Sequence, residues 1–196
     1  MQNTIQFRVQ LNDIQPAIWR TFQVDATENF FDLHSVIQIV MGWENAHLFE
    51  FKAGKRRIGL LPDEEDLWEI DDTVEDCEAV TLAEFGLKED DKLTYIYDFG
   101  DNWEHTLTVE KILPQGMSRP VCLAGERSCP PEDCGGIFGY VNMLEILRNP
   151  DHEEYEDMMD WVGEFDPELF DLHEVNELLQ EYDEWRKTFV DDDEAE

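Results

Sequence analysis

The sequence has few basic residues. Lys and Arg number 14 against 48 Asp and Glu, and the formal net charge at pH 7 is -34. A field of this sign repels nucleic-acid phosphates and anionic lipid surfaces. We therefore expect no direct contact with nucleic acid or membrane, and a partner that is an unidentified protein or small molecule. A solvated acidic surface is the simplest interpretation of the charge, and salt adaptation and mimicry of DNA phosphates are the alternatives.

Long apolar runs and secretory signals are also missing. No stretch of about 18 apolar residues occurs, and no charged start precedes a short apolar segment. This pattern predicts a cytoplasmic protein. Only four cysteines are present, too few for disulfide bonds to stabilise a chain of 196 residues. In a reducing compartment they are expected to be thiols or metal ligands.

Several enzyme motifs are absent. The sequence contains no G-x-x-x-x-G-K-[ST] loop, no G-x-G-x-x-G, no G-x-S-x-G elbow and no H-E-x-x-H helix. These absences count against nucleotide hydrolysis, dinucleotide chemistry, serine esterase action and zincin proteolysis.

The periodicity of the apolar residues predicts an α+β protein. "IQFRVQL" and "IWRTFQV" alternate like half-buried strands, and "NFFDLHSVIQIVMGW" has helical spacing, with Thr27 or Asn29 as cap and Gly42 as terminator. "HLFEFKAGKRRIG" predicts a strand pair, and "DKLTYIYDF" with "WEHTLTVEKI" a hairpin. This order resembles a ubiquitin-like β-grasp with the last hairpin strand added and a C-terminal helical part packed on the sheet.

We expect one domain over residues 1–190. Its parts are a β-grasp-like part at 1–112 with an acidic excursion at 62–79, a proline-rich loop at 113–136, and a helical part at 137–190. Residues 191–196, "DDDEAE", are expected to form a disordered acidic tail.

The hairpin "YDFGDNWEH" gathers Asp98, Asp101 and His105 near one turn. Two carboxylates and an imidazole can bind a divalent cation, or His105 can act as a general base. The simpler alternative is that these residues only build the turn, because Asp, Asn and Gly are what turns use. His34 and His47 lie beside apolar residues, and we interpret both as hydrogen-bonded packing residues.

The loop "CPPEDCGGIFGY" places Glu132 and Asp133 just ahead of a predicted helix. Its prolines hold the chain extended, and Gly135 and Gly136 allow unusual backbone angles or a close approach. A rigid loop with two carboxylates suits a binding site, although the same residues also make a capped helix entry.

Cys122, Cys129 and Cys134 are spaced C-x6-C-x4-C, whereas paired zinc ligands are usually two to four residues apart. A zinc site completed by His105 or Asp133 is one interpretation. Partly buried packing thiols are the favoured one, and redox chemistry is a third.

The motifs "QPAIWRTFQV", "DLHSVIQIVMGWENAHLFEF", "LTYIYDFGDNWEHTLTVEKI" and "CLAGERSCPPEDCGGIFGYVNMLEILRNPDHEEYEDMMDWVG" resemble the plasmid pRiA4b ORF-3-like proteins, a family also met as passenger proteins of transposable elements. The resemblance implies an α+β fold and a link to mobile DNA. The chain departs from the family where Phe49 replaces an expected second histidine after His47. The family's polar motifs extend the predicted pocket, which comprises Asp98, Asp101, Trp103, His105, Arg127, Glu132, Asp133, Gly135, Gly136 and Tyr140.

Three functional hypotheses follow. The first is a binding or accessory protein, associated with mobile elements, with a polar cleft between the hairpin and the loop. The second is a metal-dependent enzyme, for example a phosphoesterase, with His105 as the catalytic base and a divalent metal as cofactor; its metal ligands are Asp98, Asp101, His105, Glu132 and Asp133, or the three cysteines. The third is an acidic DNA-mimic decoy.

Overall fold

The computed structural model describes residues 3–61 and 73–182. In chain order the elements are β1 (Thr4–Leu11), β2 (Trp19–Asp25), α1 (Phe30–Met41), β3 (Phe49–Ala53), β4 (Arg56–Gly59), β5 (Val74–Asp76), α2 (Leu82–Phe85), β6 (Lys92–Tyr97), β7 (Trp103–Leu113), β8 (Val121–Glu126), α3 (Gly136–Leu147), α4 (Tyr155–Val162) and α5 (Leu172–Gln180).

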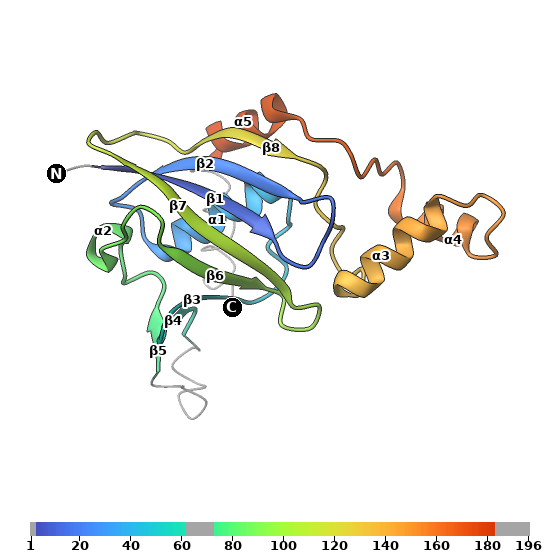
Figure 1. Cartoon of the computed structure of the whole chain (residues 1–196), viewed down its shortest axis with the longest axis horizontal. Coiled ribbons are helices and arrows are strands. Elements are labelled where there is room, and N and C mark those ends of the chain that lie inside the picture. Colours follow the sequence, from blue (N-terminus) through green and yellow to red (C-terminus); the bar gives the residue numbers. More distant parts are fainter. Residues whose placement is uncertain (1–2, 62–72, 183–196) are drawn as a thin grey trace, which may run out of the picture.

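The strands form one sheet in the order β5-β4-β3-β6-β7-β1-β2-β8 (Figure 1). All neighbours pair antiparallel except β4 and β5, which are parallel. The alternation read in the first strand has its expected consequence, because Ile5, Phe7 and Val9 are all buried. The longest strand, β7, lies in the middle of the sheet between β6 and β1, so the hairpin's second strand is a central element rather than an addition.

Helix α1 is buried along its whole length. Asn29 caps its start in a reciprocal capping box with Asp32, and Gly42 ends it in the left-handed region at φ 94°. Its polar side chains are satisfied internally: His34 Nδ1 lies 2.9 Å from the hydroxyl of Tyr95, and Gln38 donates to the same hydroxyl at 2.8 Å. His34 is therefore a packing residue, as predicted.

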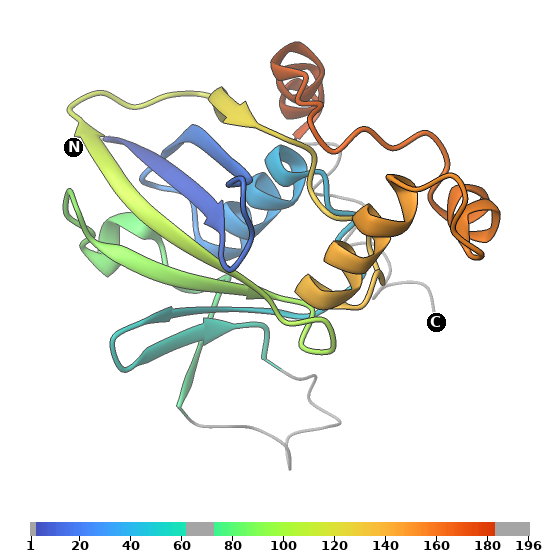
Figure 2. The same ribbon diagram turned by 45° about the vertical axis from the view of Figure 1, so that its right-hand side comes forward.

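The C-terminal helices divide into two groups. Helix α5 packs on β8 and α1, whereas α3 and α4 pack on each other at one end of the molecule (Figures 1 and 2). The prediction that the helical part covers the sheet therefore holds for α5. No helix of the described residues is long and apolar enough to cross a membrane.

The α+β class is confirmed, and the β-grasp identity stays a prediction. Two segments differ from expectation. The predicted loop at 113–136 contains β8, which pairs with β2, and the acidic excursion contains β5, which pairs with β4. Residues 62–72 of that excursion and the predicted tail at 191–196 lie outside the described residues.

Candidate functional site

The turn between β6 and β7 holds Asp98 in a fixed position. Its backbone adopts φ 54°, a left-handed conformation that Asp tolerates better than most residues. Its amide donates to the carbonyl of Leu48 at 2.9 Å, and its Oδ1 accepts from the amide of Gly100 at 2.8 Å. Asp98 is buried, and these bonds leave its Oδ2 directed away from the turn backbone toward His47.

The loop before α3 packs directly against this turn. Asp101 accepts a hydrogen bond from the amide of Gly135 at 3.0 Å, and a Cβ atom on Gly136 would stand 2.6 Å from the Asp101 carbonyl oxygen. Gly136 also has φ 66°, so glycine is needed there for two reasons. The two views agree that the tip of the β6–β7 hairpin lies beside the first turn of α3 (Figures 1 and 2).

His47, just ahead of β3, meets the residues of both segments. Its Nε2 lies 3.3 Å from Asp133 Oδ1, 3.8 Å from Asp98 Oδ2 and 3.8 Å from Glu132 Oε2. One donor atom each from His47, Asp98 and Asp133 falls within 4.8 Å of the others, a grouping compatible with a metal ion. We call these four residues the His47 cluster. The prediction that His47 only packs is therefore incomplete.

The side chain of Tyr97 orients Glu132. The Tyr97 hydroxyl donates to Glu132 Oε1 at 2.8 Å, and the backbone amide of Glu44 donates to the same oxygen at 2.8 Å. Burial, followed by the hydrogen bond to Glu132, raises the pKa of Tyr97 well above its ordinary value, so the hydroxyl keeps its proton and remains a donor. The other carboxylate oxygen, Oε2, is buried without a hydrogen-bond partner among the described residues.

Comparison with known proteins places the chain in a family. A family model described as plasmid pRiA4b ORF-3-like protein matches residues 3–174. The chain belongs to the pRiA4b ORF-3-like family. The resemblance read from the motifs is thereby confirmed.

Two relatives of this family member carry names that assign no function. The chain is 34% identical over 187 residues to the uncharacterized protein y4hQ of Sinorhizobium fredii (strain NBRC 101917 / NGR234). The match covers 91% of this chain and 92% of the relative. The chain is also similar to the crystal structure of a protein of unknown function from Methanosarcina mazei Go1, with a TM-score of 0.79, 38% identity, and coverage of 89% and 98% of the two chains. Neither name transfers an activity, so the function must be argued from the site.

The other predicted pocket residues of this pRiA4b ORF-3-like protein lie in the surrounding structure. Trp103, His105 and Tyr140 are fully buried. The His105 ring lies 5.3 Å from that of Tyr95, and burial lowers its pKa to about 4 although the neighbouring backbone of Tyr95 and Trp103 acts in the opposite direction. Arg127 is buried elsewhere, where it donates to the Pro16 carbonyl at 2.7 Å.

Among the described residues, the grouping of donor atoms compatible with a metal ion comprises His47, Asp98 and Asp133 and includes none of the cysteines. Cys122 packs in β8 with its thiol 3.6 Å from the Thr21 carbonyl oxygen. Burial raises the pKa of Cys122 to about 11 and that of Cys134 to about 12, and it also raises the pKa of Cys129. These groups are protonated thiols at neutral pH, which fits the packing interpretation.

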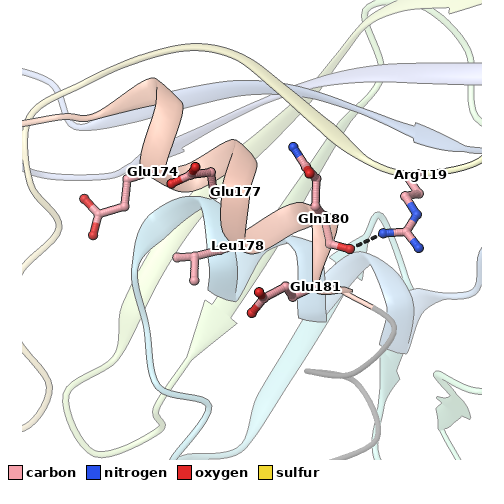
Figure 3. Close-up of a pocket in the computed structure, with 6 residues that line it drawn as sticks. All are labelled: Arg119, Glu174, Glu177, Leu178, Gln180 and Glu181. Carbon is pink, nitrogen blue, oxygen red and sulfur yellow. Dashed lines mark hydrogen bonds between the residues drawn. The ribbon is translucent and has the colours of Figure 1, made fainter.

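Two pockets of the described residues lie away from the His47 cluster. The larger, of about 610 Å³, is lined by the C-terminal part of α5 and by Arg119, which donates to the Gln180 carbonyl (Figure 3). Its other lining residues include Glu174, Glu177 and Glu181. A second pocket of about 270 Å³ is lined by residues from the end of α1 and from α5, beside Phe170. Neither gathers buried donors as the His47 cluster does.

Proposed function

We propose that this protein is a cytoplasmic binding or accessory protein, associated with mobile elements through its family, whose ligand site lies where the β6–β7 turn, the loop before α3 and His47 meet. The ligand of this site carries positive charge. One observation supports the proposal most strongly: His47 Nε2 and Glu132 Oε2 are buried without hydrogen-bond partners among the described residues, yet they face each other at 3.8 Å.

Unpaired polar atoms of this kind are costly. Each buried donor or acceptor left without a partner destabilises the fold by about 1–3 kcal/mol, and by more if the group is charged. Each such group in a native structure calls for an explanation, and a bound ion is one of the explanations. Three carboxylates around one imidazole create a negative site, so a cation relieves the repulsion and satisfies the unpaired atoms together.

Binding fits the surroundings better than catalysis. His105, the predicted general base, is fully buried beneath Trp43 and Tyr95 and cannot reach a ligand at the surface. The thiols of the described residues are protonated and so are not activated nucleophiles. The metal-dependent enzyme therefore ranks below the binding protein.

Exposed apolar side chains adjoin the site. Leu48 follows His47 and is 60% exposed, and Phe99 follows Asp98 and is 55% exposed. The hydrogen bond between Leu48 and Asp98 keeps these two segments side by side. Phe138, in the first turn of α3, is 91% exposed. Such side chains give a macromolecular or organic ligand apolar contacts around the charged centre.

A thermal-shift experiment tests the proposal. The full chain is freed of metal by chelation and heated with Zn²⁺, Mn²⁺, spermidine or arginine. A ligand present at 100 times its Kd stabilises the folded state by about 2.7 kcal/mol, which corresponds to about 5–10 °C for a chain of this size. We expect at least one cation to reach this shift in the wild type.

The matched variants are Glu132→Gln and Glu145→Gln. Glu132→Gln keeps the oxygen that accepts from Tyr97 and removes one negative charge from the site, whereas Glu145 is exposed on α3. The shift should vanish in Glu132→Gln and persist in Glu145→Gln. If no cation stabilises the wild type, or if both variants respond alike, the site is not a cation-binding site.

A further inference from the structure

The donor atoms of the His47 cluster point to one class of cation. We infer that the site binds a divalent first-row transition metal ion such as Zn²⁺ or Mn²⁺, with His47 Nε2 as the nitrogen ligand and Asp98, Asp133 and Glu132 as oxygen ligands. This inference rests on the proposed function, namely that the site takes a cation.

The spacing of the donors fits such an ion. Zinc binds imidazole nitrogen and carboxylate oxygen at about 2.0–2.2 Å, and a tetrahedral centre with these bonds separates its ligand atoms by about 3.3–3.6 Å. The distances from His47 Nε2 are 3.3 Å to Asp133, and 3.8 Å to both Asp98 and Glu132. His47, Asp98 and Asp133 form the mutually close set, and Glu132 Oε2 lies as near to His47 Nε2 as Asp98 Oδ2 does.

The donors are held in place from outside the cluster. The side chain of Asp98 is 10% exposed, and the amide of Gly100 engages its Oδ1, which orients its Oδ2 toward His47. Glu132 is fixed in the same way through Oε1 by Tyr97 and the Glu44 amide, while its Oε2 is buried and has no hydrogen-bond partner among the residues described. Supporting hydrogen bonds on the second oxygen of each carboxylate are typical of metal ligands.

The donor types select the metal. An imidazole favours zinc, iron, nickel or copper over calcium and magnesium, which prefer shells of oxygen alone. The absence of sulfur from this grouping of described residues argues against a soft ion such as Cu(I). One nitrogen and three oxygens therefore fit an ion that accepts both donor types, such as Zn²⁺ or Fe²⁺, and the three carboxylates also suit Mn²⁺.

Asp133 supplies the route of entry. Its side chain is 75% exposed, whereas those of His47, Asp98 and Glu132 are 27%, 10% and 14% exposed. An ion approaching from solvent therefore meets Asp133 first and then the more buried donors. Because Asp133 and Glu132 belong to the loop before α3 and Asp98 belongs to the β6–β7 turn, the bound ion joins these two segments to each other.

The test is metal titration of the full chain after removal of metal with a chelator. Zn²⁺ binding is followed by calorimetry, and Co²⁺ binding by its visible absorption, which reports the ligand shell directly. We expect one site per chain above the background of the acidic surface. His47→Ala should weaken that site by about a hundredfold or more, since loss of an outer-shell partner alone typically costs 10–100-fold.

Two further variants keep the test independent of folding. Asp133→Asn changes an exposed side chain and should also weaken the site at least tenfold without changing the fold. His173→Ala is the matched control, because His173 also lies beside a carboxylate, that of Glu177, but on α5 and 83% exposed. Its titration should match the wild type.

The outcomes separate this inference from the proposed function. Loss of the Zn²⁺ and Co²⁺ site in His47→Ala and Asp133→Asn, with His173→Ala unchanged, supports the metal. Equal Zn²⁺ binding in all four proteins overturns it. Stabilisation by spermidine or arginine that depends on Glu132, without a metal site, overturns the metal inference and leaves the cationic ligand standing. If none of these cations binds at the site, both are refuted.

Discussion

Replacing His105 with leucine should change how the stability of this protein depends on pH. His105 is fully buried, and burial lowers its pKa from 6.5 to about 4, although the neighbouring backbone of Tyr95 and Trp103 acts in the opposite direction. The folded state therefore keeps the ring neutral, while the unfolded chain binds a proton below about pH 6.5. Stability contributed by the neutral ring is present above pH 6.5 and is lost as pH falls toward 4.

The magnitude follows from the width of this window. One pKa unit corresponds to 1.36 kcal/mol. Protonation of His105 in the unfolded chain should therefore lower the unfolding free energy of the wild type by about 2 kcal/mol as the pH falls from 6.5 to about 5. His34, whose pKa burial lowers to about 3, adds a parallel loss that His105→Leu retains. The variant should therefore show a shallower decline than the wild type.

Urea denaturation at several pH values and constant salt measures this difference. The quantity to compare is the unfolding free energy of the wild type minus that of His105→Leu. The substitution also changes packing, but that contribution does not depend on pH and so does not affect how the difference changes with pH. That difference should fall by about 2 kcal/mol from pH 6.5 to about pH 5. A difference that stays constant over this range would refute the assignment of His105 as a neutral buried residue.

Three other substitutions test the supports of the site and of the fold. Gly139→Ala places a Cβ 1.8 Å from the Cys134 carbonyl oxygen, so the loop before α3 must move; we expect a loss of about 1–3 kcal/mol in urea denaturation together with weaker metal binding in calorimetry. Tyr97→Phe removes the donor to Glu132 and should weaken Zn²⁺ binding by about 10–100-fold in the same titration, with no change contradicting its orienting role. Arg20→Met leaves four backbone carbonyl hydrogen bonds unmade in the core and should cost about 3–5 kcal/mol of unfolding free energy; a loss below 1 kcal/mol would contradict this.

The sequence predicts the centre of the fold well because its signals there are local. The alternation in β1 and β2 and the helical spacing of α1 can each be read within a single element, although α1 is in fact buried along its whole length. Strand β8 was missed since it lies among prolines and pairs on one side only, with β2, so much of it stays partly exposed. Its partner is remote in sequence, and no local pattern reveals that pairing.

The candidate site was predictable in part. The sequence points to Asp98, Glu132 and Asp133 because turn and loop residues mark their segments. The arrangement of the ligand atoms, however, depends on three segments that meet only in the folded chain. The sequence predicts only a packing role for His47, because a single histidine beside apolar residues has no local signature of metal binding. The signal that could have identified it is its place in the family pattern, where a second histidine is expected two residues later.

An anomalous diffraction experiment on crystals of the full chain grown with Zn²⁺ shows whether the His47 cluster holds a metal ion. We expect one peak at the zinc edge, about 2.0–2.1 Å from His47 Nε2 and within bonding distance of Asp98 and Asp133. Zinc found only at other acidic surfaces, or a His47 side chain turned away from these carboxylates, would refute the metal site.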